Sequence, residues 1–257
     1  MSARLGIVIV GSEILLGKRE DCHFARTRSQ ALARGYEIGW SLLVADRWDD
    51  LLAQYRWAFA QDCPFFSFGG LGATPDDLTR AAAAAARDLP LQQHPEAAAL
   101  IRQRFGAGAE PIRIRMADLP AGARIIPNPV NQVPGFQLHN GYFFPGFPQM
   151  AEPMSDWVLE RDFPRRTPAK QLRVVLLGEK ESDWVEFMEC FCATHPQIEF
   201  SSLPSFRAEG TQIEIGLRGE ATALGAAWSA LATELSTRGT RWQELEIPPE
   251  LQNSSSE

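Results

Sequence analysis

Three short apolar runs, each followed by a loop or a helix-forming stretch, constrain the fold of this chain most strongly. Residues 4–10, 38–44 and 65–68 are nearly continuous apolar segments, as expected of strands buried on both faces of a parallel sheet. Residues 21–34 and the segment that starts at Asp46 have apolar residues at helical spacing. Strands that alternate with crossover helices indicate an α/β sheet with helices on both faces, and hence three layers.

The remaining residues complete this unit and predict a second, smaller one. In the first unit we expect helices near 95–105 and 150–163, with a hairpin over 136–144 between them. The prolines and arginines around residue 165 are typical of a linker. The sequence therefore predicts an α/β domain over residues 1–164 and a separate domain over 165–247.

The predicted second domain has the element order βαββαβ. Its elements are a strand over 171–177, a helix over 181–194, strands over 198–203 and 211–218, a helix over 220–238 and a strand over 241–246. This order is typical of the small α+β fold called ferredoxin-like. Residues 248–257 are rich in Ser, Pro and Glu, which predicts a disordered tail.

Composition narrows the classes of partner. The formal net charge is −7, and no block is rich in Lys and Arg, which argues against nucleic acid or an anionic membrane as the partner. The first apolar run is too short to span a bilayer and lacks the layout of a signal peptide, so we expect a cytoplasmic protein. The four cysteines lack the spacing of a metal site, and buried free thiols are the simpler interpretation.

A glycine-rich loop follows the third apolar run. Gly69, Gly70 and Gly72 allow a sharp turn and a close approach of backbone N–H groups to a ligand, because no Cβ atom blocks it. The segment then continues with Thr74 as a predicted helix N-cap and Pro75 as the first helical residue. This spacing predicts a helix whose first turn carries two carboxylates.

Those carboxylates, Asp76 and Asp77, have two possible roles. An acid at a helix N-terminus is stabilised by the helix dipole and needs no further function. Alternatively, a phosphate binds to the loop amides and the helix N-terminus, and an acid beside it holds a metal ion or positions a water. Neither the Walker lysine nor the dinucleotide-binding fingerprint is present.

Two further loops are expected at the same edge of the sheet. Glu13 lies in the loop after the first strand and Asp46 follows the second, so both should meet Asp77 at the carboxyl ends of neighbouring strands. Carboxylates, water and phosphate oxygens are the ligands that magnesium-like ions require. The alternatives are a helix cap for Asp46 and a solvated loop acid for Glu13. Asn128 and Asn131 could bind a base, ribose or pterin, or could only form a turn.

The ordered motifs resemble a known family. GSEILLG at 11–17, VAD at 44–46, GGLGATPDDLT at 69–79, NPVNQVPGF at 128–136 and FPGFP at 144–148 are similar to the MoaB/Mog-like molybdopterin-binding domain of the competence/damage-inducible protein A family. Residues 177–182 resemble the small domain that follows it in that family. More distantly, residues 69–79 resemble the shorter motif of the molybdopterin adenylyltransferases, whose functional acids match Asp46 and Asp77.

Three positions depart from the family pattern. Members commonly have Gly-Asp-Glu where this chain has Gly11-Ser12-Glu13, and the threonine before the paired glycines is Phe68. An asparagine after the first loop is replaced by Cys22 or His23. These departures leave fewer polar ligands but retain Asp46, Asp77 and the glycines.

The resemblance implies a nucleotide or pterin phosphate as the ligand and an ADP-ribose-like pyrophosphate as the substrate of a hydrolase. Asp46 and Asp77 would hold a divalent metal ion (magnesium, manganese or cobalt), and Glu13 would assist or activate the attacking water. The implied ligand-binding residues are Gly11, Ser12, Gly69, Gly70, Gly72, Thr74, Asp76, Thr79, Asn128 and Asn131.

Two alternatives to this hydrolase stay open. One is an enzyme of molybdenum cofactor biosynthesis, and the other is a protein that binds molybdopterin or a nucleotide without catalysis. We expect a homo-oligomer. Longer relatives carry a nicotinamide-nucleotide amidase domain, whose activity we expect to be absent here.

Overall fold

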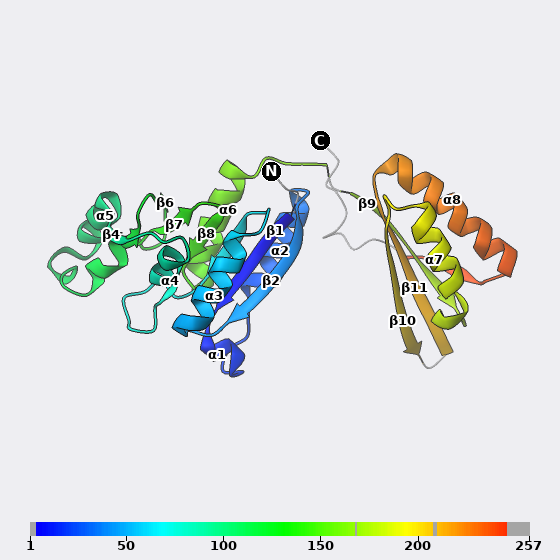
Figure 1. Cartoon of the computed structure of the whole chain (residues 1–257), viewed down its shortest axis with the longest axis horizontal. Coiled ribbons are helices and arrows are strands. Elements are labelled where there is room, and N and C mark those ends of the chain that lie inside the picture. The colour runs from blue at the N-terminus through cyan, green and yellow to red at the C-terminus, as the bar shows by residue number, and fades with distance from the viewer. Residues whose placement is uncertain (1–3, 168, 208–209, 246–257) are drawn as a thin grey trace. The chain divides into compact units, whose positions relative to one another are not determined.

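The computed structural model describes residues 4–167, 169–207 and 210–245. The described residues up to 166 form one compact unit, called unit 1, and those from 167 onward form a second, called unit 2 (Figure 1). The domain boundary at residue 164 stays a prediction, and the expected tail at 248–257 lies outside the described residues.

Unit 1 is built on a six-stranded sheet in the order β2-β1-β3-β8-β7-β6. The first four strands are parallel, and β7 and β6 run antiparallel to their neighbours. The strands are β1 (Arg4–Val10), β2 (Glu37–Val44), β3 (Phe65–Phe68), β6 (Arg124–Ile126), β7 (Gly135–Leu138) and β8 (Gly141–Phe144). A separate two-stranded sheet pairs β4 (Leu91–Gln93) with β5 (Asp118–Pro120).

Helices cover both faces of the six-stranded sheet (Figure 1). They are α1 (Ser12–Leu15), α2 (His23–Ala33), α3 (Trp48–Phe59), α4 (Thr79–Ala86), α5 (Pro95–Phe105) and α6 (Pro148–Asp162), with 3₁₀ turns η1 (Gly106–Gly108) and η2 (Arg113–Ala117). Alternate strand residues point to opposite faces: Phe65 and Phe143 pack with α3, α4 and α5, whereas Phe66 and Phe144 pack with α6. The predicted three-layer α/β architecture is confirmed.

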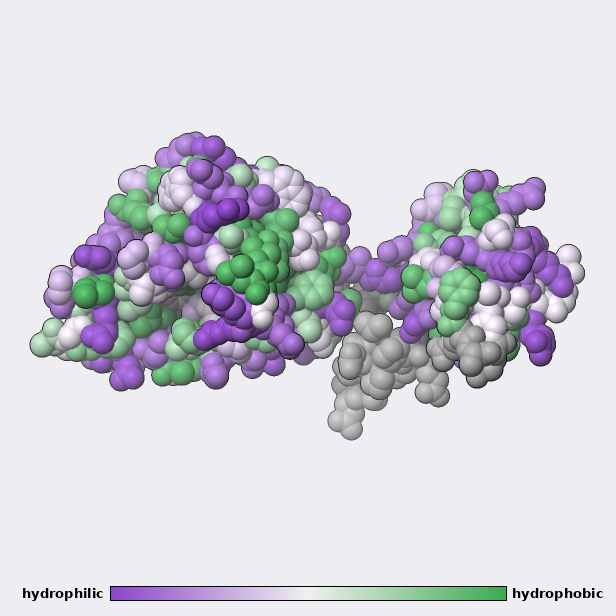
Figure 2. Space-filling view, turned by 90° about the horizontal axis from the view of Figure 1, so that it is seen from below, coloured by the Kyte–Doolittle hydropathy of each residue, from purple (hydrophilic) through white to green (hydrophobic). Residues whose placement is uncertain are grey.

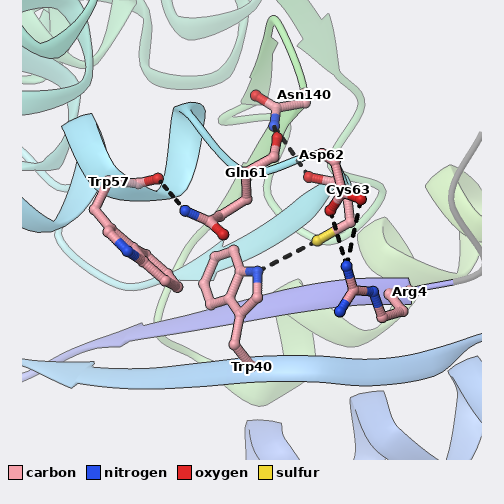
Figure 3. Close-up of polar contacts among 7 residues, drawn as sticks. All are labelled: Arg4, Trp40, Trp57, Gln61, Asp62, Cys63 and Asn140. Atoms are coloured by element: carbon pink, nitrogen blue, oxygen red, sulfur yellow. Dashed lines mark hydrogen bonds and ion pairs between the residues drawn. The ribbon is translucent and has the colours of Figure 1, made fainter.

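Polar contacts join the chain segments at the amino ends of the strands (Figure 3). Arg4 pairs with Asp62 at 3.1 Å, and the Asn140 amide donates to the carbonyl oxygen of Cys63 at 3.0 Å. The Trp40 indole N–H lies 3.3 Å from the Cys63 sulfur. Cys63 is buried, but the other three free cysteines are exposed, so the expectation of four buried thiols was wrong.

Unit 2 is a four-stranded antiparallel sheet in the order β10-β11-β9-β12. Its elements are β9 (Lys170–Leu177), η3 (Glu181–Asp183), α7 (Val185–Thr194), β10 (Glu199–Arg207), β11 (Gly210–Gly219), α8 (Ala221–Arg238) and β12 (Trp242–Glu244). The predicted βαββαβ order is confirmed. The helix expected from residue 181 starts as a 3₁₀ turn, where the buried Trp184 donates its indole N–H to Glu179 at 3.0 Å.

A fragment of residues 1–166 should fold and keep the ligand affinity of the whole chain within a few-fold. Its two apolar cores contain residues of unit 1 alone, and the core of unit 2 contains residues of unit 2 alone. Each unit therefore has the core that an independent domain needs. Circular dichroism and calorimetric titration check the fragment, and a folded fragment without affinity would contradict the assignment of the ligand site to unit 1.

Candidate ligand-binding site

A pocket of about 510 Å³ opens beside the carboxyl ends of β1, β2, β3 and β8. Most of the predicted ligand-binding and catalytic residues line it: Glu13, Asp46, Gly69, Gly70, Gly72, Thr74, Asp76, Asp77, Asn128 and Asn131. Three predicted residues do not line it, namely Gly11, Ser12 and Thr79. Three carboxylate-bearing loops therefore meet at this edge of the sheet, as the order of strands and loops in the sequence predicted.

Two glycines of the loop have left-handed backbone angles. Gly69 has φ 105° and Gly70 has φ 67°, a conformation that other residues adopt at a cost. A Cβ atom on Gly69 would lie 2.3 Å from the carbonyl oxygen of Val10, and one on Gly70 would lie 2.3 Å from the Thr79 hydroxyl. At Gly72 it would lie 2.4 Å from the Asp77 carboxylate. The glycines let the loop lie against β1, the start of α4 and the Asp77 carboxylate.

The expected helix start at Pro75 was wrong, because α4 begins at Thr79 and has no acid in its first turn. The Asp77 carboxylate instead accepts hydrogen bonds from the Thr74 N–H at 2.9 Å and from the Thr74 hydroxyl. The Asp77 N–H donates back to the Thr74 carbonyl oxygen at 3.0 Å. Such local side-chain bonds compete with helix formation. Thr74 is therefore not an N-cap, and the helix dipole does not account for Asp76 and Asp77.

Thr79 supports the glycine loop and does not line the pocket. Its fully buried hydroxyl donates to the Gly69 carbonyl oxygen at 3.0 Å and lies 3.4 Å from the Tyr55 hydroxyl. Tyr55 also lies 2.8 Å from the Ser67 hydroxyl, and burial raises the pKa of Tyr55 to about 12. This buried hydrogen-bonded group joins α3, β3 and α4 beneath the glycines.

Ser12 joins the first two loops. Its N–H donates to one Asp46 carboxylate oxygen at 2.7 Å, and its hydroxyl accepts the Asp46 N–H at 2.9 Å. Ser12 thus holds Asp46 in place without reaching the pocket, and Gly11 lies behind it with its N–H bonded to the Val44 carbonyl oxygen at 3.0 Å. The hydroxyl that replaces the family's acid therefore bonds to the main chain of Asp46, and the Ser12 main chain holds the Asp46 carboxylate.

The three proposed catalytic carboxylates keep free oxygens. Asp46 Oδ1 and Asp77 Oδ1 accept no hydrogen bond from any described residue, and the Glu13 carboxylate has no hydrogen bond or ion pair there. Within residues 4–167, 169–207 and 210–245, however, no three His, Cys, Asp or Glu are grouped closely enough to hold a metal ion. An ion here would need phosphate oxygens and water as further ligands, which is how magnesium commonly binds.

The side chains of Asn128 and Asn131 form hydrogen bonds within their own loop, and the Asn131 amide also donates to the sulfur of Met150 in α6 at 3.2 Å. The Asn128 amide donates to Asn131 Oδ1 at 2.7 Å and to the Val133 carbonyl oxygen at 3.0 Å, and its oxygen accepts the Val130 N–H at 3.0 Å. Asn131 accepts the Val133 N–H at 3.0 Å. These contacts favour the turn-forming role over a direct contact with a base or pterin.

Two arginines at the site were not anticipated. Arg19 is an exposed cation that lines the pocket and has no hydrogen bond or ion pair through its side chain among the described residues. Arg80 is buried beneath the loop, donates to the Leu71 carbonyl oxygen at 2.6 Å and has its pKa lowered by burial, while Asp77 acts in the opposite direction. Both arginines reach the loop only through the tertiary fold, and neither belongs to a local sequence motif that could have predicted its place.

Two residues that depart from the family pattern, His23 and Phe68, contact each other. The ring of His23 stacks on Phe68 with centroids 4.5 Å apart, and its Nε2 lies 3.1 Å from the carbonyl oxygen of Gly146, which lines the pocket. Since a carbonyl can only accept, Nε2 carries the proton. His23 is 6% exposed, and burial lowers its pKa.

Acidification should destabilise the parent more than a His23→Gln variant. The unfolded chain binds a proton at His23 near its ordinary pKa of 6.5, but the folded protein resists it because the folded pKa is lower. Stability from this group is therefore complete above pH 6.5 and falls as the pH drops through that value. Glutamine keeps a donor for Gly146 and does not titrate. Thermal unfolding from pH 8 to pH 5 measures the difference, and parallel profiles would contradict it.

The comparisons with known proteins define the class. Residues 6–165 match the family model described as "Probable molybdopterin binding domain", and the chain belongs to this family. A protein of Pyrobaculum calidifontis is 29% identical over 208 residues, covering 77% of this chain and 79% of that protein. Among the described residues, no helix has the length and apolar content needed to cross a bilayer.

Two further matches identify the branch of the family. A CinA-like protein of Geobacter sp. (strain M21) is 30% identical over 215 residues, which are 76% of this chain and 52% of that protein. The crystal structure of the protein CinA from Thermoplasma acidophilum, of unknown function, has a TM-score of 0.58 and 28% identity, covering 62% of this chain and 97% of that chain. The predicted MoaB/Mog-like, CinA-type membership is confirmed.

Proposed function

We propose that unit 1 binds a nucleotide or pterin phosphate and hydrolyses a pyrophosphate bond in an ADP-ribose-like substrate. The observation that carries this proposal is the joint placement of the glycine loop and three carboxylates with free oxygens around one pocket. Its volume of about 510 Å³ lies in the range of small-molecule sites. Apolar residues from distant segments, including Phe147 and Met150, supply surface for a planar ring.

In this proposal the loop from Gly70 to Thr74 contacts the phosphates. Backbone N–H groups of such glycine loops bind anions because no side chain blocks the approach. Asp46 and Asp77 would hold a divalent ion through their free oxygens, and the ion would neutralise phosphate charge and polarise the P–O bond. The carboxylate donors fit magnesium or manganese.

Glu13 is the proposed general base. Its carboxylate lies beside Gly11, where a Cβ atom would be 3.1 Å from Glu13 Oε2, and no described residue pairs with it. It would accept a proton as water attacks one phosphorus. The bond from that phosphorus to the bridging oxygen would break, and ADP-ribose would yield AMP and ribose 5-phosphate.

The test is a hydrolysis screen of ADP-ribose, other nucleoside diphosphate compounds and pterin dinucleotides with magnesium, manganese or cobalt. Metal-dependent turnover that is lost in Glu13→Gln would support the proposal. Tight binding without turnover would support the second candidate, a binding protein without catalysis, which is favoured by the absence of a three-residue metal cluster among the described residues. Turnover confined to pterin dinucleotides would support a role in molybdenum cofactor biosynthesis.

Arg19→Gln should weaken the binding of an anionic ligand about tenfold, or about 1.4 kcal/mol. Arg19 is the one cationic side chain among the described residues that line the pocket, and a hydrogen bond to a charged group contributes about 1.5–3 kcal/mol. Calorimetric titration with AMP measures the effect. Lys18→Gln is the matched control, because it removes the same charge from a neighbour outside the pocket. Equal losses in both variants would contradict a direct contact.

Cytoplasmic location and homo-oligomer formation are also proposals. Four free cysteines suit a reducing compartment. Figure 2 shows hydrophobic residues gathered in a patch on unit 1, and exposed apolar side chains of this unit include Leu15, Leu16 and Leu43. Light scattering coupled to size exclusion measures the mass, and a monomer at all concentrations would contradict the second proposal.

A further inference from the structure

We infer that His23 is a positioning residue of the pocket, because it fixes the main chain of residues 145–147, called the wall loop, and thereby sets a preference for phosphates that carry a planar ring. His23 does not line the pocket and acts through the carbonyl group of Gly146, which does. The inference rests on the proposed binding of a nucleotide or pterin phosphate at this site. It adds a residue that selects among such ligands.

The wall loop connects β8 to α6 and forms one side of the pocket. Pro145, Gly146 and Phe147 all line it. The Phe147 side chain is 56% exposed, so its ring is available to a ligand. Aromatic rings bind planar ligands by stacking and by burying apolar area. The position of the main chain in the wall loop therefore decides whether the Phe147 ring can lie against a bound base.

Few hydrogen bonds hold the main chain of the wall loop. Pro145 has no N–H group, and neither has Pro148 at the start of α6. Among the described residues, the only hydrogen bond to the main chain of residues 145 and 146 comes from His23, whose Nε2 lies 3.1 Å from the Gly146 carbonyl oxygen. Without this donor, only the two ends of the wall loop would be fixed by hydrogen bonds.

His23 is itself held in place by two elements. The Asp21 carboxylate accepts the N–H groups of His23 at 2.9 Å and of Phe24 at 3.1 Å, which anchors the start of α2. The imidazole ring is buried and stacks on Phe68 at an interplanar angle of 8°. Phe68 is the last residue of β3 and directly precedes the glycine loop. The donor nitrogen is therefore fixed relative to the loop that would bind the phosphate.

The imidazole of His23 acts as a neutral donor. Burial lowers its pKa, although the hydrogen bond to Gly146 and the charges of Asp21 and Glu152 act in the opposite direction. At neutral pH the ring is therefore uncharged and does not attract a phosphate as a cation would. Its effect should fall on the part of the ligand that meets Phe147.

The test compares AMP with ribose 5-phosphate, which has the same sugar and phosphate but no base. In calorimetric titrations at neutral pH with magnesium, the parent should bind AMP at least about tenfold more tightly, because the base adds a buried apolar contact. His23→Leu keeps a side chain of similar size but has no donor. It should reduce the preference to about threefold or less, a change within the free energy of one hydrogen bond, and leave the affinity for ribose 5-phosphate unchanged.

His23→Gln is the matched control, because glutamine keeps an N–H donor for Gly146. It should retain the parent's preference for AMP. Phe147→Ala should lose the preference as His23→Leu does, and the double variant should lose no more than either single variant, since both changes remove the same contact with the base. Circular dichroism checks that each variant is folded.

Equal affinity of the parent for the two compounds, or no affinity for either, would overturn the positioning role. It would also be overturned by an equal loss for both compounds in His23→Leu, by a His23→Gln protein that behaves like His23→Leu, or by additive effects of His23→Leu and Phe147→Ala. Hydrolysis of ADP-ribose, measured separately, decides the proposed enzymatic activity. A preference for AMP that depends on His23 but is found without hydrolysis would leave the positioning role standing and overturn the activity alone.

Discussion

Asp77→Asn should lower metal-dependent hydrolysis about 100-fold or more, on the order of 2.7 kcal/mol of transition-state stabilisation. The reason is the loss of one negative charge from the proposed ion site. Asparagine keeps an oxygen that can accept the two hydrogen bonds from Thr74, so the loop should retain its turn. The melting temperature without metal should therefore change little. Turnover of ADP-ribose and thermal unfolding of the same protein check both statements.

Asp76→Asn is the neighbour control for this result. Asp76 also lines the pocket but is exposed, and both hydrogen bonds from Thr74 go to the Asp77 carboxylate instead. We expect its activity to stay within a few-fold of the parent. Equal activity in the parent and both variants would leave the two acids with no role beyond shaping the loop.

The sheet and the meeting of the carboxylates were predictable because both follow from the order of strands and loops along the chain. Apolar runs mark the buried strands, and loops at the carboxyl ends of neighbouring parallel strands meet at one edge. Glu13, Asp46 and Asp77 therefore line one pocket. The order of the strands within the sheet was not predicted, because pairing between strands distant in sequence leaves no signal in a single sequence.

The local structure around residue 75 was not predictable from helix-start signals. Thr-Pro-Asp-Asp has the composition of a helix start, but the Asp77 carboxylate bonds back to Thr74 and delays the helix to Thr79. The same delay turns the Thr79 hydroxyl inward to the Gly69 carbonyl oxygen. Helix-capping preferences say which residue types favour each position at a helix start, but not which local hydrogen bond those residues will form.

Several residues that line the pocket were not predicted from the sequence, for a different reason. Arg19, Phe105 and Met116 come from three separate segments, and none of them belongs to a motif in the sequence. Their convergence is a property of tertiary packing. The pocket residues that lie at the ends of strands were therefore predictable, whereas those brought to the pocket by the packing of distant loops were not.

Gly69→Ala should lower the free energy of unfolding by about 3 kcal/mol and the melting temperature by roughly 6–12 °C. At φ 105° an alanine is strained, and its Cβ would lie 2.3 Å from the main-chain oxygen of Val10. That oxygen ends a central strand that is hydrogen-bonded on both sides to β2 and β3, so it cannot move aside cheaply. Thermal and urea unfolding measure the loss, and a shift below 2 °C would contradict the strain at this position.

Gly72→Ala is the matched substitution, because it adds the same methyl group three residues further along the loop. Its backbone angle is not in the left-handed region, and the Cβ would lie 2.4 Å from Asp77 Oδ2, at the end of a flexible side chain. The fold should survive while the Asp77 carboxylate turns away from Thr74. We therefore expect a melting temperature near that of the parent, together with nucleotide affinity and hydrolysis each reduced at least about tenfold, or about 1.4 kcal/mol. Unchanged affinity and turnover in a folded Gly72→Ala protein would show that neither this stretch of loop nor the position of Asp77 matters to the ligand.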